Sequence, residues 1–331
     1  MDGIYQPGVI DELRSGAQGL LPRWGLSPRT RLTLISVSEN ATFRADDPER
    51  AAPVILRVHR PRYHSLAEIE SELMWIDALR GAGAVATAAP LAMADGGRVA
   101  RFDHRGEARH VAAFAFLAGR EPEQSARLVD GFALLGAVSA RLHAHARGWA
   151  RPAGFVRKSW DWETMLGDRP HWGPWQAAPG FDAAGIALVA RASAHVRERL
   201  AAFGHGPDRF GLIHADLRLA NLLVDGDRLG VIDFDDCGFG WFLYDFAAAG
   251  TLLDHEPFFP DLQAAWLRGY RTVTPVSPED EAMMPVFAML RRILLTAWSA
   301  SHAETPGGAA MGVPYTRGTL AMAEDYLARQ A

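Results

Sequence analysis

This 331-residue chain has little cysteine, no excess of basic residues and no long apolar run, and each absence excludes a class of protein. A single cysteine, Cys237, can close no disulfide within the chain and supply no multi-thiolate zinc site, which suits a reducing compartment. Basic residues are not in excess, since the formal net charge is -5, so nucleic acid is a poor candidate for the main partner. The apolar stretch at 241–253 is too short for a membrane span and is broken by Asp245, and the start MDGIYQPGVIDELRSG lacks a secretory pattern. We therefore expect a cytoplasmic protein, with a small molecule as its partner.

The composition is that of a packed globular protein with room for two lobes, because 49% of the residues are hydrophobic and 22% are charged. Val54–Val58 (VILRV) is β-branched and apolar, and predicts a buried strand. Ser65 and Glu68 then form an S-x-x-E capping box, followed by apolar residues at helical spacing that end at Gly81. One strand therefore leads into one amphipathic helix.

A change of pattern near residue 118 marks the boundary between the two lobes. The run HVAAFAFLAG predicts a strand that ends at Gly119, and helical periodicity follows at 128–146, 261–272 and 287–301. We expect an α+β fold with a small β-rich lobe at 1–117 and a larger helical lobe at 118–331. The segment 155–175, which is rich in tryptophan, is either a lid over substrate or a long loop pinned by its aromatic residues.

The most informative stretch is 211–240, GLIHADLRLANLLVDGDRLGVIDFDDCGFG. Two short apolar strands, 222–224 and 230–233, flank an Asp-Gly pair that is typical of a hairpin. If Val224 pairs with Gly230, the register sets Asn221 opposite Asp233, where an amide oxygen and a carboxylate can bind one hard cation. The pairing therefore predicts a magnesium site.

Asp216 lies five residues before Asn221, in the loop after the first apolar run, and can reach the same place as a base or an orienting group. Phosphoryl transfer needs cations on phosphate oxygens and an acceptor for the hydroxyl proton. His214, Asp216 and Asn221 match H-x-D-x-x-x-x-N, a pattern of phosphotransferases, and Asp233 follows at a strand end. His214 either takes part in catalysis or only braces the loop. Chance turn-capping by the whole set is the less favoured interpretation.

At these residues the sequence resembles the aminoglycoside phosphotransferase-like kinases, a superfamily that includes choline kinase, type II homoserine kinase, methylthioribose kinase and the bacterial stress-response kinase. It is most similar to the stress-response and type II homoserine kinase branch. The resemblance extends over most of the chain, through SENATFRA, VILRVHRP, HADLRLAN and VIDFDD. It implies a two-lobed protein-kinase-like fold, with Mg2+ and ATP, or GTP, as cofactors.

The resemblance also assigns roles to residues. It implies that Asp216 is the catalytic base, that Asn221 and Asp233 bind magnesium, and that Phe116 and Ala118 lie in the hinge that contacts the purine. Where the family usually has a phosphate-binding lysine, this chain has Arg57, which differs in shape and hydration.

Four further acidic positions are candidates for binding or support. Glu72 borders the buried face of the capped helix, and we expect it to pair with Arg57 rather than to lie apart from it as a surface charge. Asp235 and Asp236 crowd negative charge beside Asp233, which suggests a second metal, an amine-bearing substrate or a solvated turn. Asp245 is alone in an apolar run and is expected to brace the catalytic loop.

The leading hypothesis is a kinase that phosphorylates the hydroxyl of an amino alcohol, an amino sugar or a sugar. One alternative is a serine/threonine protein kinase of the stress-response type, and another is a nucleotide-binding pseudokinase, which Arg57 and the absence of glycine in SENATFRA would suit. The sequence leaves the oligomeric state open.

Overall fold

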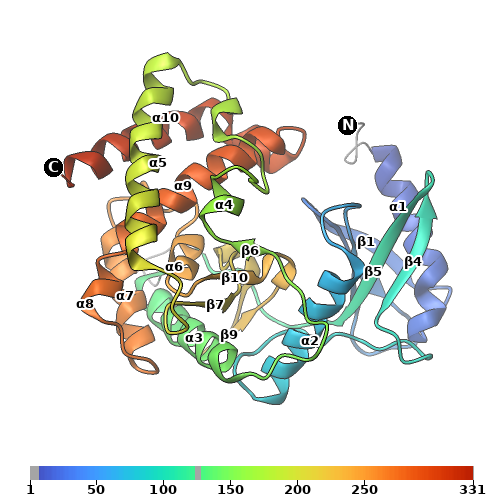
Figure 1. The fold of residues 1–331 in the computed structure, drawn as a ribbon. Helices are drawn as coiled ribbons and strands as arrows, with labels where there is room; N and C mark the ends of the chain where they lie inside the picture. The colour runs from blue at the N-terminus through green and yellow to red at the C-terminus, as the bar shows by residue number, and fades with distance from the viewer. Residues whose placement is uncertain (1–6, 124–127, 331) are drawn as a thin grey trace. The chain divides into compact units, whose positions relative to one another are not determined.

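The computed structural model of the chain describes residues 7–123 and 128–330. It divides into two compact units, unit 1 with residues 1–118 and 151–157, and unit 2 with residues 119–150 and 158–331 (Figure 1). Unit 1 is built around a sheet and unit 2 is mainly helical, so the predicted α+β class is confirmed. Among the described residues, no helix combines the length and the apolar character needed to cross a membrane.

Unit 1 contains one antiparallel sheet whose strands lie in the order β1-β2-β3-β5-β4. Its elements are α1 (Pro7–Leu20), η1 (Leu21–Trp24), β1 (Arg31–Val37), β2 (Ala41–Asp46), β3 (Val54–Val58), α2 (Leu66–Gly81), β4 (Val99–His104) and β5 (Glu107–Ala115). The predicted capping box is present, because the side chain of Ser65 accepts from the backbone of Glu68 and Glu68 reaches back to the backbone of Ser65. The helix begins and ends where the sequence pattern predicts.

The alternation of side chains along β3 decides which helix each of its residues meets. Leu56 and Val58 belong to a buried apolar cluster that also contains Leu13 of α1. Arg57 points to the opposite face, where it meets Glu72 of α2. One short strand therefore separates the apolar core of unit 1 from a buried ion pair.

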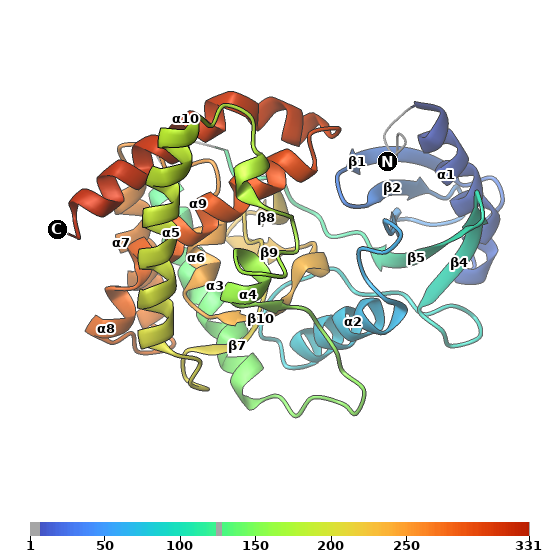
Figure 2. The same cartoon turned by 45° about the horizontal axis from the view of Figure 1, so that its top comes forward.

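Unit 2 combines short strands with long helices. Its elements are α3 (Leu128–Gly148), β6 (Ser159–Trp160), α4 (Trp162–Met165), η2 (Trp175–Ala177), α5 (Ala183–Phe203), β7 (Phe210–Ile213), η3 (Leu219–Asn221), β8 (Leu222–Asp225), β9 (Arg228–Val231), η4 (Phe234–Asp236), β10 (Gly238–Trp241), α6 (Tyr244–Ala249), α7 (Phe259–Arg271), α8 (Pro278–Glu281), α9 (Met284–Ser301) and α10 (Pro306–Ala328). Helix α10 packs along α5 and α9 (Figure 2).

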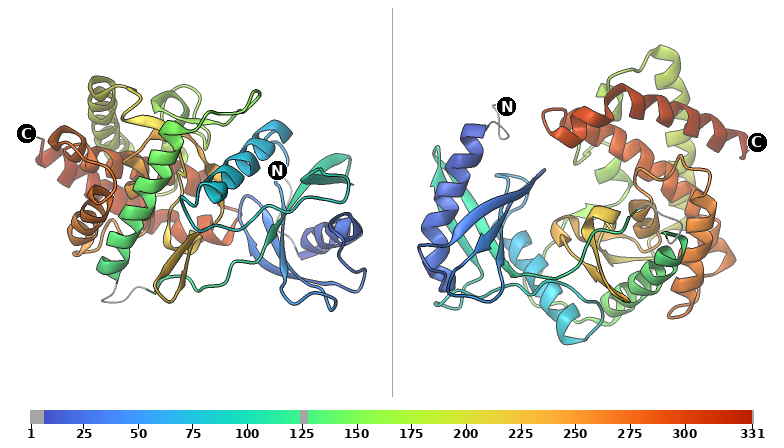
Figure 3. Two further views of the ribbon diagram at one scale, coloured as in Figure 1. Left: turned by 90° about the horizontal axis from the view of Figure 1, so that it is seen from below. Right: turned by 180° about the vertical axis from the view of Figure 1, so that it is seen from behind.

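Helices α3 and α7 run side by side at very short range (Figure 3). A Cβ added at Gly136 of α3 would overlap the carbonyl oxygen of Trp266, and one added at Gly269 of α7 would overlap that of Ala133. The two glycines therefore allow backbone to touch backbone. This close crossing brings His143 of α3 within hydrogen-bond distance of Tyr270 of α7.

The β8–β9 hairpin is present, but its predicted register was wrong by one residue. Val224 pairs with Leu229 and Asp225 with Arg228, so two residues form the turn, whereas the predicted pairing of Val224 with Gly230 would leave five residues, 225–229, between the strands. Gly226 takes a φ of 60° at the first turn position, a conformation that glycine adopts without strain. A one-residue slip changes what lies opposite each side chain, and Ile232, not Asp233, meets the backbone of Asn221.

Candidate active site

The loop that follows β7 carries the candidate catalytic residues, and a buried carboxylate holds it in place. Asp245, at the start of α6, accepts backbone N–H groups of His214 at 3.1 Å and of Ala215 at 2.7 Å. Ala215 has a φ of 67°, which a residue with a Cβ adopts at a cost. Asp245 is fully buried, and these bonds supply the partners that a buried carboxylate needs. This is the arrangement that the predicted bracing role requires.

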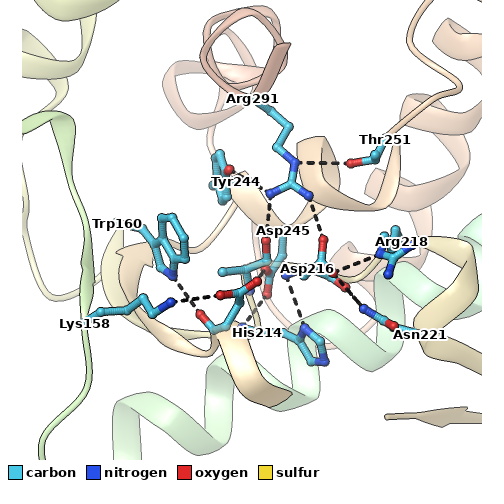
Figure 4. Close-up of polar contacts among 12 residues, drawn as sticks. Lys158, Trp160, His214, Asp216, Arg218, Asn221, Tyr244, Asp245, Thr251 and Arg291 are labelled. Carbon is cyan, nitrogen blue, oxygen red and sulfur yellow. Dashed lines mark hydrogen bonds and ion pairs between the residues drawn. The ribbon is translucent and has the colours of Figure 1, made fainter. Parts of the chain in front are cut away.

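Asp216 is half-buried and receives hydrogen bonds on both carboxylate oxygens (Figure 4). Its Oδ2 accepts from Nδ2 of Asn221 at 2.8 Å and from Nε of Arg218 at 3.0 Å. Its Oδ1 accepts from Nη2 of Arg291 at 2.6 Å. Two cations and one amide therefore fix the orientation of the candidate base. Of these three residues the sequence motif contained only Asn221, which was predicted as a metal ligand.

Arg291 comes from α9 and is 5% exposed. Burial disfavours its charged form, yet the pKa of Arg291 is raised above its ordinary value because Tyr244 and Asp216 stabilise the cation. Burial also raises the pKa of Tyr244, which keeps this hydroxyl protonated. The signal that could have revealed Arg291 is the pair of arginines inside the apolar run MLRRILLTAW, because buried cations need partners.

His214 is fully buried, and both of its ring nitrogens contact backbone groups. Its Nε2 donates to the carbonyl oxygen of Ile232 at 3.1 Å, and its Nδ1 accepts from the backbone N–H of Asp216 at 3.3 Å. These bonds join the loop after β7 to the residue before Asp233. Of the two predicted roles for His214, the geometry favours bracing.

The predicted metal ligands, Asn221 and Asp233, have chemistry that suits Mg2+. Both hydrogens of the Asn221 amide are used, since Nδ2 donates to the backbone oxygen and to Oδ2 of Asp216, so the amide oxygen is left for a cation. Asp233 does not end a strand as expected, but lies two residues beyond β9 with a φ of 61° and is exposed. Residues 7–123 and 128–330 contain no group of three or more His, Cys, Asp or Glu side chains that could hold a metal ion. This fits Mg2+, which commonly takes one or two protein ligands and completes its shell with phosphate and water.

The neighbouring acidic residues differ in their surroundings. Asp235 is buried, whereas Asp236 accepts from Nζ of Lys158 at 2.9 Å. The indole of Trp160 donates to the backbone oxygen of Asp236 at 2.7 Å. Three tryptophans of the 155–175 segment, Trp160, Trp172 and Trp175, are buried, so the pinned loop fits better than the lid.

The candidate nucleotide residues belong to unit 1. The expected ion pair is present, because Nη2 of Arg57 lies 2.5 Å from Oε2 of Glu72 and both side chains are buried. The guanidinium of Arg57 also lies 5.1 Å from the ring centroid of Phe114. Phe116 and Ala118, just after β5, are exposed. The guanidinium carbon of Arg44 lies 5.2 Å from the ring centroid of Phe116.

Comparison with known proteins shows the family to which this chain belongs. Residues 31–283 match the phosphotransferase enzyme family. An uncharacterized protein of Deinococcus radiodurans is 30% identical over 327 residues, which cover 95% of this chain and 88% of that protein. The chain belongs to the phosphotransferase enzyme family, and it is a small-molecule kinase.

Two solved structures share the fold over nearly the whole chain. The structure of a microcompartment-associated aminopropanol kinase is 45% identical, with a TM-score of 0.89, and the match covers 96% of this chain and 98% of that one. An amicoumacin kinase in complex with AMP-PNP, Ca2+ and Ami is 22% identical, with a TM-score of 0.76 and coverage of 94% and 93%. The predicted protein-kinase-like fold and family resemblance are therefore confirmed.

Proposed function

We propose that this chain transfers the γ-phosphate of ATP to the hydroxyl group of a small amino alcohol, with Mg2+ as its divalent cation. The observation that carries the proposal is the 45% identity, over 96% of the chain, to a structure described as an aminopropanol kinase. The geometry around Asp216 is compatible with it, because a fixed carboxylate next to a candidate cation site is what phosphoryl transfer to an alcohol needs.

In the proposed reaction the hydroxyl oxygen of the acceptor forms a bond to the γ-phosphorus. The bond between this phosphorus and the β,γ-bridging oxygen breaks, and ADP leaves with the electron pair. Asp216 orients the hydroxyl group and takes its proton. Asp245 keeps the backbone at Ala215 in its left-handed conformation, which sets the direction of the Asp216 side chain.

Asn221 and Asp233 are the residues that would hold Mg2+, which when bound neutralises charge on the phosphate oxygens. Arg57, fixed by Glu72, is proposed to contact the nucleotide phosphates in place of the usual lysine. Phe116 and Ala118 are proposed to flank the purine.

An amino alcohol carries an ammonium group, which needs a negative partner. Asp235 and Asp236 supply carboxylates close to Asp233 in the sequence. The charge of Asp236 is offset by Lys158, whose ammonium lies 2.9 Å from it. Asp235 and Asp236 both remain candidates for the substrate amine.

The test measures ADP release by the wild type and by Asp216→Asn, with and without MgCl2. The acceptors are 1-amino-2-propanol, ethanolamine, choline, homoserine, a hexosamine and a generic protein, and 1,2-propanediol is the uncharged control for the first. We expect Mg2+-dependent turnover that is fastest with a small amino alcohol, weaker with the diol, and lost in Asp216→Asn. Replacing ATP with GTP measures nucleotide choice.

Three results would contradict the proposal. Equal turnover of the diol and the amino alcohol would remove the role of the amine. Phosphate on the polypeptide acceptor would favour a protein kinase. Nucleotide binding without transfer to any of these acceptors would favour a pseudokinase.

A further inference from the structure

Two adjacent arginines of α9 are buried, and each forms an ion pair with a carboxylate, but the two carboxylates lie in different parts of unit 2. Arg292, 4% exposed, binds Asp254 at 2.8 Å and also donates to two residues of α10, so it ties helices together. Arg291, 5% exposed, turns instead toward the catalytic loop, where Nη2 meets Oδ1 of Asp216. Similar burial and similar pairing thus allow one arginine to serve as a control for the other.

The hydrogen bonds to Asp216 leave one acceptor position at which an alcohol can bind. A carboxylate offers about four acceptor positions, two on each oxygen. On Oδ2 both are taken, by Asn221 at 2.8 Å and by Arg218 at 3.0 Å. On Oδ1, the part of the chain that the structure describes supplies one donor, Arg291. The position that remains for a hydroxyl group is therefore on the oxygen that Arg291 holds.

We propose that Arg291 is a positioning residue for phosphoryl transfer, which turns Asp216 so that Oδ1 receives the hydroxyl of the acceptor. The inference rests on the role proposed above for Asp216. It adds a residue outside the catalytic loop on which the geometry of that loop depends.

The remaining bonds of Arg291 explain why an arginine is needed. Nη1 donates to the carbonyl oxygen of Ala215 and to the hydroxyl of Tyr244, both at 3.2 Å, and Nε donates to Thr251 at 3.2 Å. Because Asp245 holds the N–H group of Ala215, Arg291 completes the restraint on this left-handed residue from the carbonyl side. The planar fork of a guanidinium makes these bonds together, and an ammonium group cannot.

The test compares Arg291→Lys with Arg292→Lys. Both substitutions keep a long side chain with a positive charge. We expect Arg291→Lys to lower kcat about 100-fold, the effect of displacing a catalytic group by about 1 Å, with KM for ATP and for the acceptor close to the wild-type values. Arg292→Lys should lower the melting temperature and leave kcat of the folded enzyme close to wild type. In Arg291→Ala, millimolar guanidinium should restore part of kcat, while urea or ammonium at the same concentration should not.

Wild-type kcat in Arg291→Lys would overturn the inference, and so would an equal loss of kcat in Arg292→Lys, which would indicate a general effect of packing. These outcomes are distinct from failure of the proposed function. That failure would appear in the wild type, as absence of transfer or as activity that survives Asp216→Asn.

Discussion

The Nε2 atom of His143 lies 2.9 Å from Oδ2 of Asp245, and neither side chain is exposed to solvent. Because a carboxylate can only accept, Nε2 carries the proton, and Nδ1 accepts from the hydroxyl of Tyr270 at 3.0 Å. Burial lowers the pKa of His143 although Asp245 opposes the shift, and burial raises the pKa of Tyr270 to about 12. The hydroxyl of Tyr270 on α7 thus donates to His143 on α3, and neutral His143 donates to Asp245, the carboxylate that holds the loop after β7.

Removing the histidine should weaken the fold. His143→Phe leaves Asp245 with one donor fewer in a buried place, so we expect the free energy of unfolding to fall by about 1–3 kcal/mol. Tyr270→Phe removes one hydroxyl from the other side of the ring and should cost about 1 kcal/mol. Denaturation with urea measures both. A loss in Tyr270→Phe that equals the loss in His143→Phe would contradict this order of importance.

The lowered pKa of His143 predicts how stability depends on pH. Its ordinary pKa is 6.5, so below about pH 6.5 the unfolded chain binds a proton that the folded chain excludes. The contribution of neutral His143 to the free energy of unfolding is therefore fully present above pH 6.5. It is lost as the pH falls from 6.5 toward the lowered pKa of His143, by about 1.4 kcal/mol for each unit by which that pKa is lowered. The measurement is the free energy of unfolding from pH 7.5 to pH 5.

The matched control is His143→Gln, in which nothing titrates at this position. Burial also lowers the pKa values of His110 and His171, but these act equally in both proteins. The difference between the pH dependences of the wild type and His143→Gln therefore reports the titration of His143. Parallel curves would show that His143 does not cause the loss of stability at low pH.

The close crossing of α3 and α7 predicts a position where one methyl group is not tolerated. Gly269→Ala would force a Cβ into the carbonyl of Ala133, so we expect a loss of about 1–3 kcal/mol or more, and a displaced Tyr270. Gly131→Ala, on α3 with nothing within 4 Å of the added Cβ, should instead be neutral or stabilise by about 0.5–1 kcal/mol. Thermal unfolding distinguishes the two, and similar melting temperatures would argue against the backbone contact.

The buried ion pair of unit 1 gives a prediction about the nucleotide. In Glu72→Gln, Arg57 keeps a hydrogen-bond partner of similar size but loses the charge that fixes it. We expect the Kd for ATP to rise about tenfold, the equivalent of one charge-assisted hydrogen bond of about 1.4 kcal/mol. Calorimetric titration with AMP-PNP measures this. Unchanged affinity would mean that the pair serves only the packing of α2.

Local patterns were enough to predict several elements and to select candidate site residues that lie together in the structure. The capping box and apolar spacing gave the limits of α2, because both signals act within one turn of helix. The spacing of His214, Asp216 and Asn221 pointed to one loop, and the structure places these three residues there in one hydrogen-bonded group.

Features that depend on tertiary contacts were missed or misplaced. The hairpin register failed because Val224 can pair either with Leu229, across a two-residue turn, or with Gly230, across a longer loop, and the Asp-Gly signal does not decide between the two. Arg291 lies 75 positions from Asp216, so no local spacing relates the two. The same holds for His143 and Asp245, which are 102 positions apart.

Lys158 has a chemical consequence that reaches beyond its ion pair with Asp236. It is the single lysine in the sequence, and its ammonium lies 5.0 Å from the ring centroid of Trp160 with 7% of the side chain exposed. Reagents that acylate amines therefore have one side-chain target in the whole protein, and it is a buried one. Attachment there would remove the cation that offsets Asp236, so the fraction of chains acylated at Lys158, read from the peptide that carries it, reports how often this part of unit 2 opens.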